Sequence, residues 1–130
     1  MSAQGKIRTP LARVRGLGAS RSGTQDFWRM RLTSVALIPL TIAFVLIVVA
    51  LLGRNHAAVV QILGSPLVAI LMLLFVVTSV YHMRLGMQEI IVDYIHDELW
   101  KIVAVMANTF FCVVAGLACI YALLKLSFGL

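Results

Sequence analysis

The chain has 130 residues, of which 62% are hydrophobic and 12% are charged, and its mean hydropathy is +1.01. A soluble domain carries about 25% charged residues, so this composition excludes a soluble protein and indicates an integral membrane protein. The formal net charge is +6. No nucleic-acid-binding element or aromatic platform accompanies the basic residues, so we expect no nucleic acid partner.

Most basic residues lie in an N-terminal arm, which we assign to residues 1–30. Seven of the eleven Lys and Arg residues precede the first apolar run, namely Lys6, Arg8, Arg13, Arg15, Arg21, Arg29 and Arg31. This bias predicts a cytoplasmic N-terminus. The arm resembles a mitochondrial presequence in being Arg- and Ser-rich, but it lacks an apolar signal region and a cleavage site, so we expect it to be retained. Its glycines and serines predict an irregular stretch at residues 16–23.

Three charge-free apolar runs follow, at residues 32–52, 67–83 and 102–124. About 20 residues in a helix cross the bilayer core. The sequence therefore predicts an all-α fold, with residues 31–130 forming a domain of three transmembrane helices. Pro66 suits the first turn of the second helix, and Pro39 is expected to bend the first.

The second helix is expected to continue through Arg84 and Gly86 towards Asp93, because its charge-free run is the shortest. Residues 53–65 would form a periplasmic loop, residues 93–101 would lie on the cytoplasmic side, and the C-terminus would lie outside. In the third helix, Cys112 and Cys119 are spaced on one face, too far apart along the axis for a disulfide. We expect both to be small packing residues.

Four residues of the second helix share one face. With His82 at zero and 100° per residue, Gly86 falls at about +40°, Glu89 at about −20° and Asp93 at about +20°. Ionisable groups at membrane depth are costly, so this stripe predicts a functional site. Arg84 lies about 160° from Gly86, and its counter-charge is a lipid headgroup, another subunit or a cofactor propionate.

His82 admits two interpretations. An imidazole can ligate haem iron, and a glycine one turn away lets a flat macrocycle approach the backbone. Alternatively, the ring is hydrogen-bonded to a hydroxyl or carbonyl of a neighbouring helix. A six-coordinate haem needs a second axial ligand, and neither His56 nor His96 is placed to supply it. The haem interpretation therefore implies a partner subunit.

Asp93 and Tyr94 end the stripe, about 16–17 Å along the helix from His82. A tyrosine at this depth can anchor a helix at the membrane interface. Alternatively, a phenol beside a carboxylate can donate a hydrogen bond to a quinone carbonyl and help to deliver protons.

Two motifs resemble a known family. The motif on the second helix is His82-x3-Gly86-x6-Asp93-Tyr94. The motif at the entry to the first helix is Gly23-x2-Asp26-Phe27-x3-Arg31-x-Thr33. Together they resemble the hydrophobic membrane-anchor D subunits of bacterial succinate dehydrogenase, respiratory complex II, and the resemblance extends over nearly the whole chain.

The resemblance implies that His82 is an axial ligand of the iron of haem b, shared with a histidine of a companion cytochrome b556-type C subunit. It also implies that Arg31 faces the haem propionates, that Tyr94 hydrogen-bonds ubiquinone, and that Asp93 supports this tyrosine or the proton path. It gives no definite role to the intervening residues Arg84, Gln88 and Glu89.

The implied function is that of a lipid-embedded anchor for a flavoprotein and an iron–sulfur subunit, which carry out succinate oxidation and pass electrons to ubiquinone. The basic arm and residues 93–101 are expected to contact the iron–sulfur subunit. We expect the bacterial inner membrane, with the mitochondrial inner membrane as second choice. The alternatives are a structural three-helix scaffold without cofactor and a stand-alone cytochrome b-like protein, although the latter would need its own second axial ligand.

Overall fold

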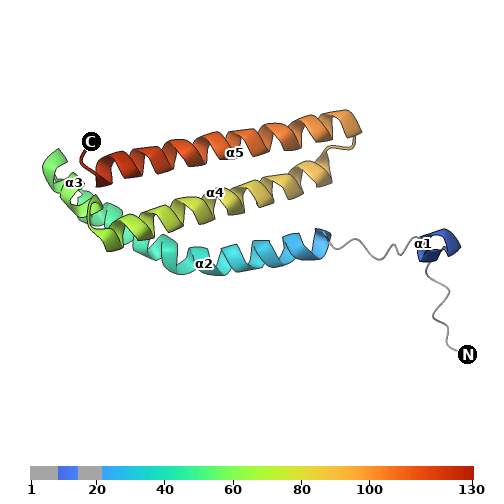
Figure 1. Ribbon diagram of the computed structural model, residues 1–130, viewed down its shortest axis with the longest axis horizontal. Helices are drawn as coiled ribbons and strands as arrows, with labels where there is room; N and C mark the ends of the chain where they lie inside the picture. Colours follow the sequence, from blue (N-terminus) through green and yellow to red (C-terminus); the bar gives the residue numbers. More distant parts are fainter. Residues whose placement is uncertain (1–8, 15–21) are drawn as a thin grey trace, which may run out of the picture.

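Three long helices form a single layer. The structure, a computed structural model, describes residues 9–14 and 22–130, which form the helices α1 (Pro10–Val14), α2 (Ser22–Leu51), α3 (His56–Leu63), α4 (Pro66–Tyr94) and α5 (Glu98–Ser127). By length and hydropathy, α2, α4 and α5 are each able to cross a membrane. Figure 1 shows these three side by side with α4 in the middle. The prediction of an all-α fold is confirmed, and the three long apolar helices are consistent with the three predicted spans.

Helix α4 is the central element. It packs against α2 on one side and α5 on the other, whereas α2 and α5 do not contact each other. Consecutive long helices run in opposite directions (Figure 1). The start of α2, the end of α4 and the start of α5 therefore lie at one end of the layer, which we call the charged end because Asp26, Arg29, Glu89 and Lys101 lie near it.

Helix α2 begins earlier than its charge-free run. It starts at Ser22, so the last two residues of the stretch expected to be irregular are helical. The rest of that stretch, residues 16–21, lies outside the described residues, as do residues 1–8 and 15. Pro39 lies inside α2, and Figure 1 shows α2 changing direction in the turquoise stretch near residue 40. A proline removes one helical hydrogen bond and commonly bends a helix.

The segment predicted as a loop at residues 53–65 contains the short helix α3, so that prediction was wrong in part. Asn55 caps α3 by accepting a hydrogen bond from the Ala58 backbone N–H at 2.9 Å. Leu63 is buried, and its carbonyl accepts a hydrogen bond from Ser127 Oγ at 2.9 Å. Apolar contacts and this bond hold α3 against the ends of the long helices.

Helix α4 runs without interruption from Pro66, at its first position, to Tyr94. This confirms the prediction that the second helix continues beyond its apolar run. Its apolar half is packed against α2 by the stacked rings of Phe44 and Phe75, whose centroids are 4.3 Å apart with an interplanar angle of 11°.

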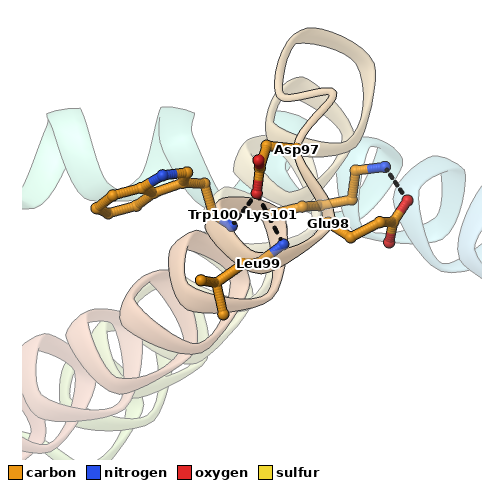
Figure 2. A network of polar contacts seen from close by, with 5 residues as sticks. All are labelled: Asp97, Glu98, Leu99, Trp100 and Lys101. Carbon is orange, nitrogen blue, oxygen red and sulfur yellow. Dashed lines mark hydrogen bonds and ion pairs between the residues drawn. The ribbon is translucent and has the colours of Figure 1, made fainter.

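The connection between α4 and α5 is shorter than the predicted loop at residues 93–101, since only residues 95–97 are non-helical. Asp97 caps α5 by accepting from the backbone N–H groups of Leu99 at 3.0 Å and Trp100 at 3.2 Å (Figure 2). Glu98 and Lys101 form an ion pair at 3.4 Å on the first turn. A capping carboxylate at a helix N-terminus explains why α5 starts so soon after α4 ends.

Very little of the apolar surface is covered by the chain itself. The buried hydrophobic side chains among the described residues are Leu63, Met72, Leu85, Ile91 and Cys112. Cys112 is 1% exposed, as expected of a packing residue, but Cys119 is exposed, so the expectation that both are packing residues is wrong for Cys119. The remaining apolar faces are available to lipid or to other subunits.

Candidate functional site

His82 lies on the face of α4 that contacts α2. Its Nδ1 atom is 2.9 Å from Oγ1 of Thr33, and both groups are partly buried. The hydrogen bond to a neighbouring helix, expected under the alternative interpretation of this histidine, is therefore present. It uses only one of the two ring nitrogens.

The surroundings of Thr33 bear on which ring nitrogen carries the proton. Thr33 Oγ1 lies 2.8 Å from the Arg29 carbonyl and 3.0 Å from the Met30 carbonyl. A hydroxyl has one proton, and carbonyl oxygens can only accept. When that proton is donated to one of these carbonyls, the Thr33 oxygen accepts from Nδ1–H of His82, and Nε2 then keeps a lone pair. This is the tautomer that a metal ligand needs.

Gly86 lies one turn from His82 and also faces α2. A Cβ atom built there would meet only Met30 Cε, at an ordinary contact distance of 3.9 Å. Packing within this chain therefore does not require a glycine, although glycine weakens a helix interior by about 1 kcal/mol relative to alanine. One turn from His82, the chain thus leaves room for a Cβ atom that the glycine does not use.

A cavity of about 420 Å³ lies between α2 and α4 near the charged end, lined by Asp26, Phe27, Met30, Arg31 and Glu89. The stripe predicted from helical spacing is thus confirmed for three of its members, because His82, Gly86 and Glu89 all face α2. The fourth member, Asp93, is exposed.

Arg31 is a cation without a carboxylate partner among the described residues. Its guanidinium lies over the Phe27 ring, 4.8 Å from the centroid, which is a favourable cation–π position. The nearby Asp26 forms an ion pair with Arg29 instead, at 3.7 Å. The charge of Arg31 is therefore available to an anionic group that enters the cavity.

Asp93 and Tyr94 form the last turn of α4, and both side chains are exposed. Tyr94 is 78% exposed. Within the described part of the chain, neither residue has a hydrogen bond to the other or to a third residue. The structure thus keeps the phenol and the carboxylate accessible at the charged end.

The two other histidines lie away from His82. His56 begins α3, at the opposite end of the layer, and His96 lies in the α4–α5 connection. The described residues contain no cluster of three or more His, Cys, Asp or Glu side chains that could hold a metal ion. Neither of the two other histidines is placed to act together with His82 on one metal ion.

Sequence reasoning missed two features of this site. Thr33 belongs to the first motif, but its partner could be identified only once the rotation of α2 against α4 was known. Glu89 was predicted to share the face of His82 but was given no role, and it lines the same cavity as Arg31. The helical spacing that places Glu89 and Gly86 on the face of His82 was the signal from which Glu89 could have been assigned to the site.

Comparison with known proteins gives a consistent result. Residues 5–116 match the family described as "Succinate dehydrogenase/Fumarate reductase transmembrane subunit". The "Succinate dehydrogenase hydrophobic membrane anchor subunit" of Paracoccus denitrificans is 31% identical over 121 residues, which cover 93% of this chain and 93% of that protein. The protein of the same description from Rickettsia bellii is 26% identical over 89% of this chain and 93% of its own length. No solved structure gives a significant match.

Proposed function

Since the chain belongs to the succinate dehydrogenase/fumarate reductase transmembrane subunit family, we propose that this membrane anchor subunit provides one axial ligand of haem b and part of a ubiquinone-reduction site. The observation that carries the proposal is the imidazole of His82, bonded through Nδ1 to Thr33 at 2.9 Å. Hydrogen bonding at one ring nitrogen orients the ring and leaves the other nitrogen for iron.

In this proposal Nε2 of His82 ligates the haem iron, and a histidine of the companion C subunit supplies the second ligand. The bound haem supplies one-electron chemistry. Gly86 gives the macrocycle space beside the helix. A purely structural scaffold would account for the His82–Thr33 bond but gives no reason for a glycine at a position where the chain itself has room for a side chain.

Arg31 is proposed to neutralise a haem propionate at the charged end. Support comes from its lack of a carboxylate partner among the described residues, because Asp26 is already paired with Arg29. A guanidinium can bind a carboxylate through two parallel hydrogen bonds. Phe27, beneath the guanidinium, limits the directions in which Arg31 can point.

Tyr94 is proposed to donate a hydrogen bond from its phenol to a carbonyl oxygen of ubiquinone. Asp93, on the same helical turn, would relay protons from water to that position, because quinone reduction consumes two protons. Support comes from the exposure of both side chains at the end of α4, where lipid and water meet.

The charged end is proposed to be the cytoplasmic side and the docking surface for the iron–sulfur subunit, which in turn carries the flavoprotein. The excess of basic residues before the first apolar run supports this orientation. The bacterial relatives make a bacterial inner membrane the preferred location.

The haem assignment is tested by visible spectroscopy of the purified, dithionite-reduced complex. We expect a b-type α-band in the wild-type complex and its loss in His82→Ala. His56→Ala is the matched control, since it removes an exposed histidine outside the long helices, and it should leave the band unchanged.

Assembly is monitored in the same preparations by co-purification of the other subunits and by succinate oxidation with an artificial dye acceptor. An absent α-band in the wild type would contradict the assignment. So would an unchanged band in a fully assembled His82→Ala complex.

A further inference from the structure

The side of α4 that faces α5 carries a second charged residue at membrane depth. Arg84 lies there, and its Nε donates to Thr109 Oγ1 of α5 at 3.4 Å. Asn108 of α5 donates from Nδ2 to the Arg84 carbonyl at 3.1 Å. These two bonds hold the backbone at Arg84 and one of the five N–H donors of its guanidinium.

No carboxylate in the described part of the chain neutralises Arg84. The ion pairs there join Asp26 to Arg29 and Glu98 to Lys101. Arg84 is half-buried, and no side-chain nitrogen or oxygen in the described part is both buried and without a hydrogen-bond partner. The remaining guanidinium N–H groups are therefore accessible to an anionic group from outside the chain.

The depth of Arg84 limits what that group can be. Helix α4 has 29 residues and is about 43 Å long, whereas the hydrocarbon core is about 30 Å thick. Arg84 lies ten residues before the end of α4, which places it about 8 Å inside the core when the helix is centred in the bilayer. The bond to Thr109 holds the side chain at this depth. Lipid phosphates lie outside the core, so a headgroup is excluded.

A propionate of a cofactor bound at His82 would be on the wrong side of α4. His82 is bonded to Thr33 of α2, whereas Arg84 is bonded to Thr109 of α5. Two positions along a helix differ by about 200°, so the body of α4 lies between Arg84 and a group held by His82. Of the three counter-charges that the sequence allows, this leaves a carboxylate of another subunit.

A second copy of this chain has no suitable carboxylate. The chain has five acidic residues, and three of them lie at the charged end before the apolar runs, namely Asp26, Asp97 and Glu98. Of the other two, Glu89 lines the cavity towards α2, and Asp93 is on the last turn of α4, about 13 Å further along the axis than Arg84. Charged groups at membrane depth pair with one another, so the partner is a membrane-spanning segment of a different chain.

An apolar groove beside Arg84 is available to such a segment. It lies between α4 and α5 and runs from Arg84 and Thr109 to Ile120. Three of its apolar side chains are more than half exposed, namely Val77, Val113 and Leu117. Cys112 and Gly116 are buried between the helices. Small residues where helices meet allow a further helix to approach closely.

We propose that a membrane-spanning helix of another chain packs in the α4–α5 groove and places an Asp or Glu carboxylate on the guanidinium of Arg84. The carboxylate accepts from the terminal N–H groups of Arg84, while Thr109 keeps Nε. An apolar helix with one carboxylate complements both the cation and the rest of the groove. This interface lies on the side of α4 opposite to His82 and does not depend on the haem or quinone assignment.

The test is carbodiimide crosslinking of the assembled complex that carries Arg84→Lys. The hydrophobic reagent dicyclohexylcarbodiimide enters the membrane and converts a carboxylate to an O-acylisourea. The introduced amine attacks the acyl carbon, dicyclohexylurea leaves, and an amide bond remains. Mass spectrometry of the linked peptides identifies the carboxylate. We expect a link from position 84 to an Asp or Glu in a membrane-spanning segment of another chain.

Arg54→Lys is the matched control, because Arg54 is an exposed cation at the other end of the layer. Its amine should give no link to that carboxylate. A link from position 84 only to Glu89 or Asp93 of the same chain, or only to a second copy, would overturn the proposal. Absence of any link in an assembled Arg84→Lys complex would also overturn it.

A second measurement leaves Arg84 intact, so it remains decisive if Arg84→Lys does not assemble. The photoreactive residue p-benzoylphenylalanine replaces Leu117, which lines the groove, and the assembled complex is irradiated. We expect a link to a membrane-spanning segment of another chain that contains an Asp or Glu. Adding Arg84→Gln should lower its yield several-fold, because the carboxylate then lacks its partner. Links to lipid alone, or an unchanged yield in Arg84→Gln, would contradict the proposal.

Discussion

The two faces of α4 place polar groups at the same membrane depth in different ways. On the face towards α2, His82 is bonded at one ring nitrogen by Thr33, and the neighbouring Gly86 leaves open space. On the face towards α5, Arg84 is bonded through Nε to Thr109 and lies at the end of an apolar groove. In each case a helix hydroxyl orients a side chain whose remaining nitrogen atoms stay accessible to groups from outside the chain.

The glycines at the two contacts of α4, Gly86 towards α2 and Gly116 towards α5, differ in the room that they leave for a side chain. Gly86 has room for a Cβ atom, whereas a Cβ on Gly116 would lie 3.3 Å from Val80 Cγ1, tighter than an ordinary contact. Gly116 therefore serves the packing of α4 on α5. The packing of α2 on α4, by contrast, does not require a glycine at position 86.

The largest effect is expected for Gly86→Leu. A leucine side chain would fill the space beside His82, so haem content per complex should fall nearly to zero. Gly86→Ala should leave the packing of α2 on α4 intact, since its Cβ would meet only Met30 Cε at 3.9 Å. Haem is measured as the pyridine haemochrome. A Gly86→Leu complex with full haem content would show that the macrocycle does not use this face.

Tyr94→Phe should lower ubiquinone reductase activity by about 100-fold, because it removes a positioned proton donor. Succinate oxidation with a dye acceptor should not change. Tyr121→Phe, which removes an exposed hydroxyl near the other end of α5, is the matched control and should have no effect on either activity. Parallel loss of both activities in Tyr94→Phe would indicate failed assembly and would contradict a role confined to the quinone.

Thr33→Val keeps the shape of the side chain but removes the bond to His82. We expect haem affinity to fall by about 10-fold, with a change in the haem reduction potential, as is usual when the hydrogen-bond partner of a ligating histidine is lost. Ser34→Ala is the control, because Ser34 donates to the Met30 carbonyl at 2.7 Å without contacting His82. If both variants bind haem as the wild type does, Thr33 is not a positioning residue for haem.

The smallest effect is expected for Gly116→Ala. The added methyl group would lie 3.3 Å from Val80 Cγ1, at a cost of about 1–3 kcal/mol in the packing of α4 on α5, and alanine would return about 1 kcal/mol to the helix, so we expect a net loss of no more than about 2 kcal/mol. The complex should dissociate at a lower temperature, while the reduced spectrum at low temperature should remain that of the wild type. An altered spectrum would mean that the two faces of α4 are coupled.

Sequence patterns predicted most of the fold because the features concerned are local. Hydropathy identified the three spans, and the short second run correctly indicated that α4 continues to Tyr94. Helix α3 was missed because residues 53–65 were assigned to a loop as a whole, although Asn55 before an apolar run is an N-terminal capping signal. The membrane orientation stays a prediction.

The candidate site was predictable only within one helix. Angular spacing placed His82, Gly86 and Glu89 on one face and Arg84 on another, and both placements are confirmed. The partners Thr33 and Thr109 lie on other helices, and a single sequence does not give the rotation of one helix against the next. The expectation for Cys119 was wrong for this chain, since Cys119 is exposed although Cys112, seven residues earlier on α5, is buried.

The short helix α3 has a mechanical consequence for the bundle. It contacts all three long helices, and its last residue is tied to the end of α5 by the bond from Ser127 to the Leu63 carbonyl. Sliding of one long helix against another along its axis would break these contacts, which lie at the end of the layer opposite to the charged end. Helix α3 thereby restrains the long helices from the end opposite to the candidate site, 23 residues after Thr33 and 19 residues before His82.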